Sequence, residues 1–204
     1  MKELKQALIE RFGEGNVHDF APQGENDFPL LLISSDKRSK ITILMTNGLS
    51  KYKMPVHEKH AGREHTELYF CLPNYWDLEN LQKQWVFEWI QKMARYLTEK
   101  QTWFGVGHTI PNGNPAVPLS PTMNQRYLLL NDPMYLRNEL TPLTLEDTEI
   151  HFLGIIPIFE DEMDYKMARG TYKLVQKMEG KGISELLDDY RMSFLKSKWR
   201  ILKR

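Results

Sequence analysis

The sequence has a single cysteine and no surplus of charge of either sign. Cys71 is the only cysteine among 204 residues, so the chain has neither an intrachain disulfide nor a zinc site built from cysteines. Lys and Arg number 27, and Asp and Glu also number 27, which leaves a formal net charge of zero. Proteins that bind nucleic acid usually carry surplus Lys and Arg that face the phosphates. The balance therefore argues against nucleic acid as a partner.

Long apolar runs are also missing. No run approaches the roughly 20 residues that a membrane-spanning helix needs. The first twelve residues, MKELKQALIERF, are too charged for a signal peptide, and no Asn-x-Ser/Thr glycosylation site occurs. These absences indicate a cytoplasmic protein without a membrane partner. With 41% apolar and 26% charged residues, the composition is that of a soluble globular protein, and the length fits a single domain at 1–204.

Apolar segments predict a β-sheet. Strands are expected at 30–34, 40–45, 66–72, 127–130 and 150–158. In the third of these, alternate residues share one face and Pro73 ends the strand. The segment 150–158 is hydrophobic enough for a central position in the sheet. We expect the first, second, third and fifth of these strands to lie in one sheet.

Helical periodicity appears in four places. Helices are expected at 4–12, at 78–97 after a cap at Asp77, at 160–178 and at 183–194. The second carries an apolar stripe of Leu78, Leu81, Trp85, Trp89, Met93 and Tyr96. Residues expected to point inward from the last two are Met163, Met167, Leu174, Met178, Ile183, Leu186, Leu187, Tyr190 and Phe194. We predict Trp85, Trp89, Leu68, Phe70, Phe152 and Ile155 to be buried. Strands and helices do not alternate regularly, which favours an α+β fold with a mostly antiparallel or mixed sheet and helices packed on it.

The segment 105–124 is rich in proline and glycine, and we expect it to be long and irregular. Such loops are often functional in compact domains. Its GHTIPNG stretch (107–113) is predicted to be ordered, because Pro111 fixes one dihedral angle and Asn112-Gly113 suits a tight turn. Thr109 and Asn112 can satisfy nearby backbone groups, and His108 follows a glycine that lets the backbone turn. His108, Thr109 and Asn112 are therefore candidate binding residues.

Sequence motifs of catalysis are absent. The chain has neither a Gly-x-Ser-x-Gly nucleophile turn nor a Gly-Lys-Ser/Thr phosphate loop, and Cys71 lies within a predicted strand, where free cysteine is usually a small buried hydrophobe. His57, His60 and His65 lie close together, but they lack the i, i+4 spacing of a helical zinc site, and Gly62 interrupts any helix. We predict a polar, flexible surface loop there without a metal, and no cofactor.

Two further groups are candidates for a binding surface. Tyr75 and Trp76 lie in the link between the third strand and the strongest helix, where aromatic residues often anchor a contact. Glu160, Asp161 and Glu162 stand at the start of a helix, where their charge complements the helix dipole. The same carboxylates would serve acid–base chemistry if the fold brought them to His108. The basic end, KSKWRILKR, is interpreted as a solvated helix end.

Four segments, taken in order, resemble the suppressor-of-fused family. They are TNGLSKYKMPV (46–56), ELYFCLP (67–73), GHTIPNG (107–113) and FLGIIPIFEDEMDYKMARG (152–170). The resemblance covers about residues 25–178 and leaves 179–204 as a C-terminal helical extension. It implies an α+β domain. Animal members are non-enzymatic regulators that hold a transcription factor of Hedgehog signalling inactive, with a groove between two domains where a peptide adds as a strand.

The chain is similar to the N-terminal domain of those proteins and looks like the short bacterial members, some of which are thought to be immunity proteins that neutralise toxins. The resemblance thus implies a non-enzymatic domain that binds another protein, with a toxin as one such partner. An alternative is a small-molecule-binding protein or enzyme built on GHTIPNG and the carboxylates at 160–164. A third hypothesis is a self-associating module. Binding requires an exposed groove or sheet edge, whereas the enzyme requires a pocket in which His108 meets a carboxylate.

Overall fold

The computed structural model describes residues 3–21, 24, 27–36 and 39–195. Its strands are β1 (Val17–Phe20), β2 (Leu30–Ser35), β3 (Ile41–Thr46), β4 (Thr66–Pro73), β5 (Thr109–Pro111), β6 (Tyr127–Asn131), β7 (Leu143–Leu145) and β8 (Thr148–Ile158). Its helices are α1 (Leu4–Phe12), α2 (Trp85–Glu99), α3 (Glu160–Arg169) and α4 (Thr171–Glu179). Short 3₁₀ helices occupy Glu14–Asn16, Leu49–Lys51, Glu58–His60 and Leu81–Lys83.

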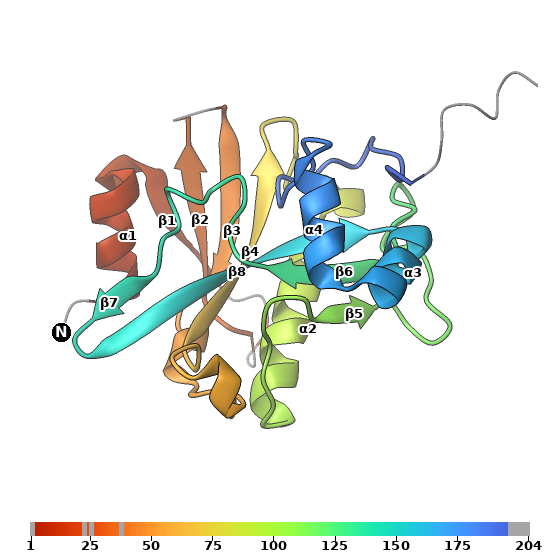
Figure 1. Ribbon diagram of the computed structural model, residues 1–204. Helices are drawn as coiled ribbons and strands as arrows, with labels where there is room; N and C mark the ends of the chain where they lie inside the picture. Colours follow the sequence, from red (N-terminus) through yellow and green to blue (C-terminus); the bar gives the residue numbers. More distant parts are fainter. Residues whose placement is uncertain (1–2, 22–23, 25–26, 37–38, 196–204) are drawn as a thin grey trace, which may run out of the picture.

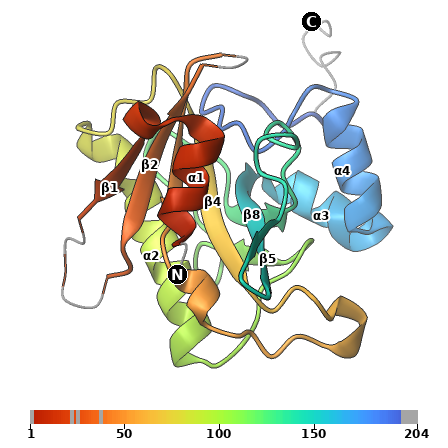
Figure 2. The same cartoon turned by 90° about the vertical axis from the view of Figure 1, so that its left-hand side faces the viewer.

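The strands form one mixed sheet in the order β1-β2-β3-β4-β8-β6-β5, with β7 paired to β8 outside this path (Figure 1). Neighbours run antiparallel except β4 and β8, which are parallel. Helix α2 covers one face, and α1 and α4 lie on the other (Figure 2). The predicted α+β class and mixed sheet are confirmed, as is the single sheet shared by the four long strands.

Strand β4 shows why the sheet has a core on each side. Its eight residues are all buried. Leu68, Phe70 and Leu72 pack in the cluster that contains α2, whereas Tyr69 and Cys71 pack in the cluster that contains α1. A strand covered on both faces needs apolar residues at successive positions, which explains the unbroken apolar run LYFCL at 68–72. The six side chains predicted as core are all buried: Trp85, Trp89, Leu68, Phe70, Phe152 and Ile155.

A buried carboxylate organises the loop after β3. Glu67 is fully buried and accepts hydrogen bonds from the backbone N–H groups of Gly48 and Ser50, both at 3.0 Å. The hydroxyl of Ser50 donates at 2.6 Å, and the hydroxyl of Thr46 donates as well. Burial raises the pKa of Glu67, while these hydrogen bonds oppose the shift. The TNGLS stretch therefore wraps around an acid supplied by ELYFCLP.

The last predicted helix, at 183–194, is not formed. Residues 180–195 follow an irregular path, and Tyr190, predicted to point inward, is 79% exposed. Two charged side chains, and not an apolar stripe, fix the position of this segment. Glu185 accepts from the backbone N–H groups of residues 134–136 at 2.8 to 3.0 Å, and Arg191 donates to Glu162 at 2.6 and 2.8 Å. The remainder of the predicted extension, 196–204, lies outside the described residues.

Two other helices are shorter than predicted. The helix expected at 160–178 is divided into α3 and α4 by Gly170, whose φ of 86° a helix cannot contain. Met167, expected inward, is 72% exposed. Helix α2 begins at Trp85 and not at residue 78. The side chain of Asp77 accepts a hydrogen bond from the N–H of Glu79 and so closes a turn, not the helix. Leu81 belongs to a separate 3₁₀ helix, where it is 81% exposed.

Candidate functional site

A tight turn at 105–108 leads the chain into β5. The N–H of His108 donates to the carbonyl of Gly105 at 3.1 Å, and Gly107 has a φ of 85°. Glycine adopts that backbone at little cost. A Cβ on Gly107 would also lie 2.6 Å from Oγ1 of Thr171, at the start of α4. Part of the segment predicted to be irregular is therefore a strand. Both the turn that precedes this strand and the packing of α4 require a glycine at position 107.

Strand β5 is an edge of the sheet, and nothing in the described part of the chain pairs with its outer side. The carbonyl of His108 accepts a hydrogen bond from β6, and the N–H of Asn112 donates to the residue before β6, both at 2.9 Å. Backbone groups alternate in direction along a strand. The N–H and C=O of Thr109 and the C=O of Pro111 therefore point away from the sheet. Three backbone groups are available there to an added strand.

A groove of about 560 Å³ runs beside this edge. We call it the β5 groove. Its walls are Trp89, Lys92, Met93 and Tyr96 of α2, then Phe104, residues 107–111, and Lys166 of α3. Most of the lining is apolar, and it includes two lysines but neither Asp nor Glu. Of the predicted site residues, the structure brings His108 and Thr109 to this groove.

The imidazole of His108 packs against aromatic rings. Its centroid lies 4.4 Å from that of Trp103 and 6.4 Å from that of Phe104. Burial lowers the pKa of His108, and the nearby charges of Lys166 and His60 lower it further. Both effects favour the neutral form of the ring. It stabilises the wall of the groove and leaves the lysines as the charged groups there.

Two lysines give the groove its charge. The Nζ of Lys92 lies 4.4 Å from the ring centroid of Trp89, a cation–π contact. The Nζ of Lys166 donates to Oγ1 of Thr109 at 3.2 Å and so links α3 to β5. Burial lowers the pKa of Lys166 from its usual value of 10.5.

Asn112 has a role in the adjoining loop. Its Nδ2 donates to the carbonyl of Pro118 at 2.7 Å, and its own carbonyl accepts from the N–H of Val117 at 2.8 Å. These bonds close the loop 112–118. Asn112 is not among the residues that line the β5 groove.

Tyr75 and Trp76 lie apart from the groove lining. Trp76 is buried, with its ring 6.1 Å from that of Trp85. Tyr75 is 43% exposed, and its hydroxyl donates to Asp189 at 3.0 Å. Burial and the neighbouring Asp189 raise the pKa of Tyr75. Trp76 thus belongs to the core, and Tyr75 helps to hold the C-terminal segment.

Two of the three carboxylates at the start of α3, Glu160 and Asp161, line a different hollow, beside Arg126 and Arg191. Glu160 lies 3.4 Å from Arg126, and Asp161 accepts from the hydroxyl of Ser193 at 2.7 Å. Glu162 is fully buried against Arg191. None of these carboxylates lines the groove with His108. The structure therefore does not assemble the acid–base pair that the alternative hypothesis requires.

The clustered histidines are held by separate contacts. The rings of His57 and His60 lie 5.6 and 5.0 Å from that of Trp103, whereas Nδ1 of His65 is 2.7 Å from the carbonyl of Ser50. Within the described ranges, no three His, Cys, Asp or Glu side chains are grouped as metal ligands. Burial raises the pKa of the Cys71 thiol well above its usual range, so this thiol is a poor nucleophile.

Sequence reasoning missed Lys92, Trp103, Phe104 and Lys166. The two lysines look like ordinary polar positions of amphipathic helices, and only the fold brings them to one groove. Trp103 and Phe104 directly precede the predicted loop, and two adjacent aromatic residues there are the one signal that was available.

The described helices include none that is long and apolar enough to cross a membrane.

Comparisons with known proteins identify the fold. The family described as "Suppressor of fused protein (SUFU)" matches residues 26–192. The chain in the Sufu–Fu complex crystal structure is 17% identical with a TM-score of 0.68, over 94% of this chain and 92% of that one. A structure described as a SUFU homologue from Neisseria gonorrhoeae is 16% identical with a TM-score of 0.62, and the match covers 95% of this chain and 97% of that one.

The structure of Drosophila Suppressor of Fused is 17% identical with a TM-score of 0.67, over 94% of this chain but 50% of that one. This chain therefore spans about half of the Drosophila protein. A sequence comparison with curated proteins found no match. The family match extends to residue 192, beyond the limit of 178 expected from the sequence, and so includes most of the irregular C-terminal segment.

Proposed function

Because this chain belongs to the suppressor of fused family, we propose that it acts in the cytoplasm by binding another protein, and not by catalysis. The observation that carries the proposal is the unpaired edge of β5 beside an apolar groove. The relative in the Sufu–Fu complex, which shares this fold, is bound to a partner, and this supports the proposal. The single cysteine is buried and free, which fits a reducing compartment.

The binding mode that fits the edge is strand addition. An extended segment of the partner would accept a hydrogen bond from the N–H of Thr109 and donate to the carbonyls of Thr109 and Pro111. Each such bond contributes about 0.5–1.5 kcal/mol net. Three of them are too few for stable binding, so alternate side chains of the segment must also bury apolar area in the groove.

The charge of the groove indicates which segment fits. Lys92 and Lys166 lie in its lining without a carboxylate among the lining residues. A partner segment with apolar side chains and a Glu or Asp would complement this charge, whereas a basic segment would be repelled. We therefore propose an extended, acidic and apolar segment of another protein as the ligand.

A selection from a random peptide library tests this function. The full-length chain serves as bait, and Thr109→Pro is the test variant, because this change removes the outward N–H but no hydrogen bond to β6. Thr109→Val is the control for loss of the hydroxyl. Selected peptides should be acidic and should bind Thr109→Pro at least about tenfold more weakly than Thr109→Val. Equal binding to both variants would contradict strand addition.

The finer proposal is that the bound protein is a toxin, which this chain neutralises. It is supported by the resemblance to short bacterial family members and by the fold shared with the Neisseria gonorrhoeae protein. Coexpression with the product of the neighbouring gene tests it. Wild type should restore growth when that product is toxic, and Thr109→Pro should not. A toxic neighbour that wild type neither binds nor neutralises would contradict the immunity role.

A further inference from the structure

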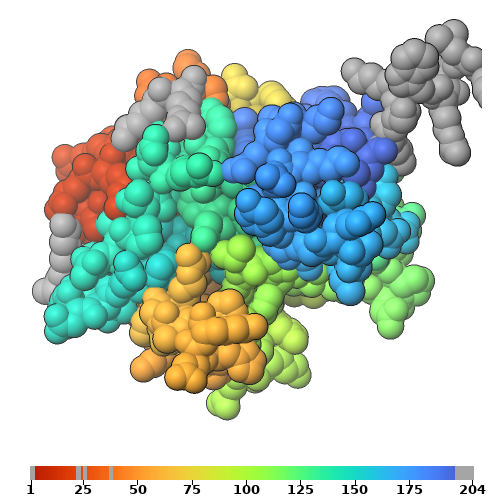
Figure 3. All heavy atoms as spheres, viewed as in Figure 1, coloured from red at the N-terminus to blue at the C-terminus, as the bar shows by residue number. Residues whose placement is uncertain are grey.

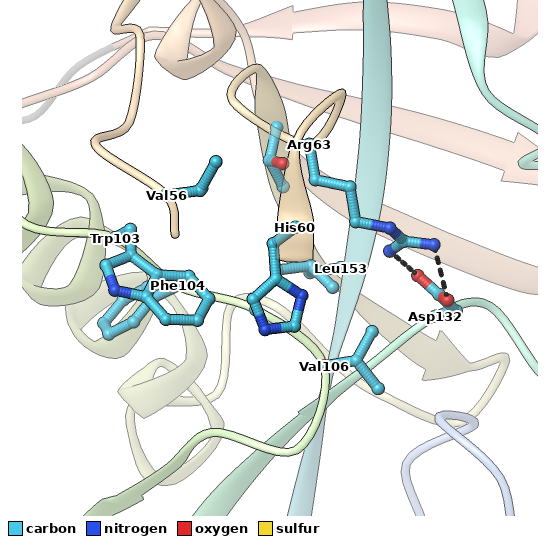
Figure 4. A pocket seen from close by; sticks show the side chains of 10 residues that line it. Val56, His60, Arg63, Trp103, Phe104, Val106, Asp132 and Leu153 are labelled. Carbon is cyan, nitrogen blue, oxygen red and sulfur yellow. Dashed lines mark hydrogen bonds and ion pairs between the residues drawn. The ribbon is translucent and has the colours of Figure 1, made fainter. Parts of the chain in front are cut away.

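A second hollow lies beside the segment 103–106, between it and the loop that carries His60 (Figure 4). We call it the Trp103 pocket. Its volume is about 220 Å³. In Figure 4 the rings of Trp103 and Phe104 stand on one side, the side chains of Arg63 and Asp132 on the other, and His60 between them. Val106 lies at the rim, where it is 39% exposed.

The pocket is next to the β5 groove. Phe104 lines both hollows, and Trp103 of the pocket contacts His108 of the groove. In the space-filling view, the green 100–111 region reaches the surface between the orange loop and the blue helices α3 and α4 (Figure 3). A protein bound at the edge of β5 would therefore have the pocket beside it.

The walls determine which group fits. A cavity of about 150 Å³ lined by apolar residues holds benzene, so about 220 Å³ gives room for an aromatic ring with a substituent. The rings of Trp103 and Phe104 offer faces and edges for aromatic contacts. These walls favour a planar apolar group over a flexible polar one.

The polar wall determines which substituent fits. Arg63 donates to the two carboxylate oxygens of Asp132 at 2.6 and 3.0 Å, and the two side chains are 38% and 45% exposed. Their charges offset each other, so a charged ligand gains little and loses hydration. A carboxylate has about four acceptor positions. Asp132 can therefore accept one more hydrogen bond, from a hydroxyl.

We propose that the Trp103 pocket binds a tyrosine side chain of the partner, with its ring against the wall of Trp103, Phe104 and His60 and its hydroxyl donating to Asp132. This inference rests on the proposed function, because it adds an anchor to the segment bound at β5. A buried aromatic anchor next to a short backbone ladder would supply the affinity that three hydrogen bonds lack.

Titration of the ¹⁵N-labelled full chain with p-cresol tests the pocket without any partner. Saturable shifts are expected at the amides of Gly105 and Val106 and at the indole N–H of Trp103, with a Kd of about 1 mM. The amides of Gln91 and Arg95, which line a different hollow, should not move. The absence of saturable shifts at the three pocket groups would overturn the proposal.

Two variants and one analogue sharpen the test. Val106→Phe fills the pocket from its exposed rim and should abolish p-cresol binding while the melting temperature is retained. Toluene lacks the hydroxyl and should bind at least about fivefold more weakly than p-cresol. That difference should vanish in Asp132→Ala. Retained binding by Val106→Phe, or equal affinity for toluene in wild type, would overturn the assignment.

The inference and the proposed function fail in different ways. Peptides selected on the full chain should contain tyrosine and should bind Val106→Phe at least about tenfold more weakly. Peptides that depend on Thr109 but not on Val106 would leave strand addition intact and overturn the pocket. Peptides that ignore both Thr109 and Val106 would overturn both.

Discussion

The indole of Trp103 and the imidazole of His108 lie 4.4 Å apart, measured between ring centroids. Trp103 lines the Trp103 pocket and His108 lines the β5 groove, so this contact joins the walls of the two hollows. His57 and His60 contact the same indole from the preceding loop. Trp103 thus connects the loop at 57–60 to the edge strand.

The lowered pKa of His108 predicts a pH dependence of stability. The folded state resists protonation of this ring, whereas the unfolded chain takes up a proton near pH 6.5. His108 therefore contributes stability above pH 6.5, and this contribution is lost as the pH falls through the lower folded pKa. The melting temperature should fall between about pH 7.5 and pH 5, and less steeply in His108→Gln. Identical slopes for the two proteins would contradict the shift.

Trp89 is expected to be important for stability because it is 6% exposed and packs in the core between α2 and the sheet. Trp89→Ala should lower the free energy of unfolding by about 3–5 kcal/mol, through lost burial and a cavity. Leu81→Ala is the control, since Leu81 is 81% exposed and the change should stay within about 0.5 kcal/mol. Urea denaturation measures both. A cost below about 1 kcal/mol for Trp89→Ala would be inconsistent with this packing.

Glu185 should stabilise the fold through its hydrogen bonds. It is 1% exposed, and removal of its carboxylate leaves the backbone donors of residues 134–136 without their acceptor. Glu185→Ala should cost at least about 3 kcal/mol, because each orphaned donor costs about 1–3 kcal/mol. Glu179→Ala removes a half-exposed ion pair with Arg137 and should cost about 1 kcal/mol or less. Similar losses in the two variants would argue against the role of Glu185.

Asn112 should prove structural although it lies next to the edge strand. Asn112→Ala removes the bond to Pro118 and should lower stability by about 1 kcal/mol. Binding of the selected peptides should be unchanged, in contrast to their loss in Thr109→Pro. Isothermal titration calorimetry separates the two cases. A large loss of affinity in Asn112→Ala at unchanged stability would place this side chain in the binding site.

The long strands and the core were predictable because apolar periodicity reports burial directly. The apolar alternation of Leu68, Phe70 and Leu72 predicted a strand, and α2 retains the phase of its stripe at Trp85, Trp89 and Met93. The C-terminal segment was not predictable in this way. Its path depends on Glu185, whose partners lie 49 to 116 residues away in the chain, and on Arg191, whose partners lie 29 and 34 residues away. Side-chain bonds over such separations leave no local pattern in the sequence.

The candidate site shows the same division. GHTIPNG was identified from its turn residues, yet the strand within it depends on pairing with β6, and β6 lies beyond the loop. Lys92 and Lys166 meet at one groove although they are far apart in sequence. Glu160, Asp161 and Glu162 were grouped correctly at a helix start, but in the fold their partners are Arg126, Ser193 and Arg191 respectively. Contacts between elements that are distant in the sequence determine which residues form the site, and no pattern of sequence spacing predicts those contacts.

Amide hydrogen exchange at Thr109 tests the central claim most directly. In the free chain this N–H points away from β6 and should exchange as fast as an exposed amide, whereas the amide of Ile110, which faces β6, should be protected. A saturating amount of selected peptide should slow exchange at Thr109 at least about tenfold and change Ile110 little. A peptide that binds tightly while the Thr109 amide still exchanges at its free rate would contradict binding by strand addition at β5.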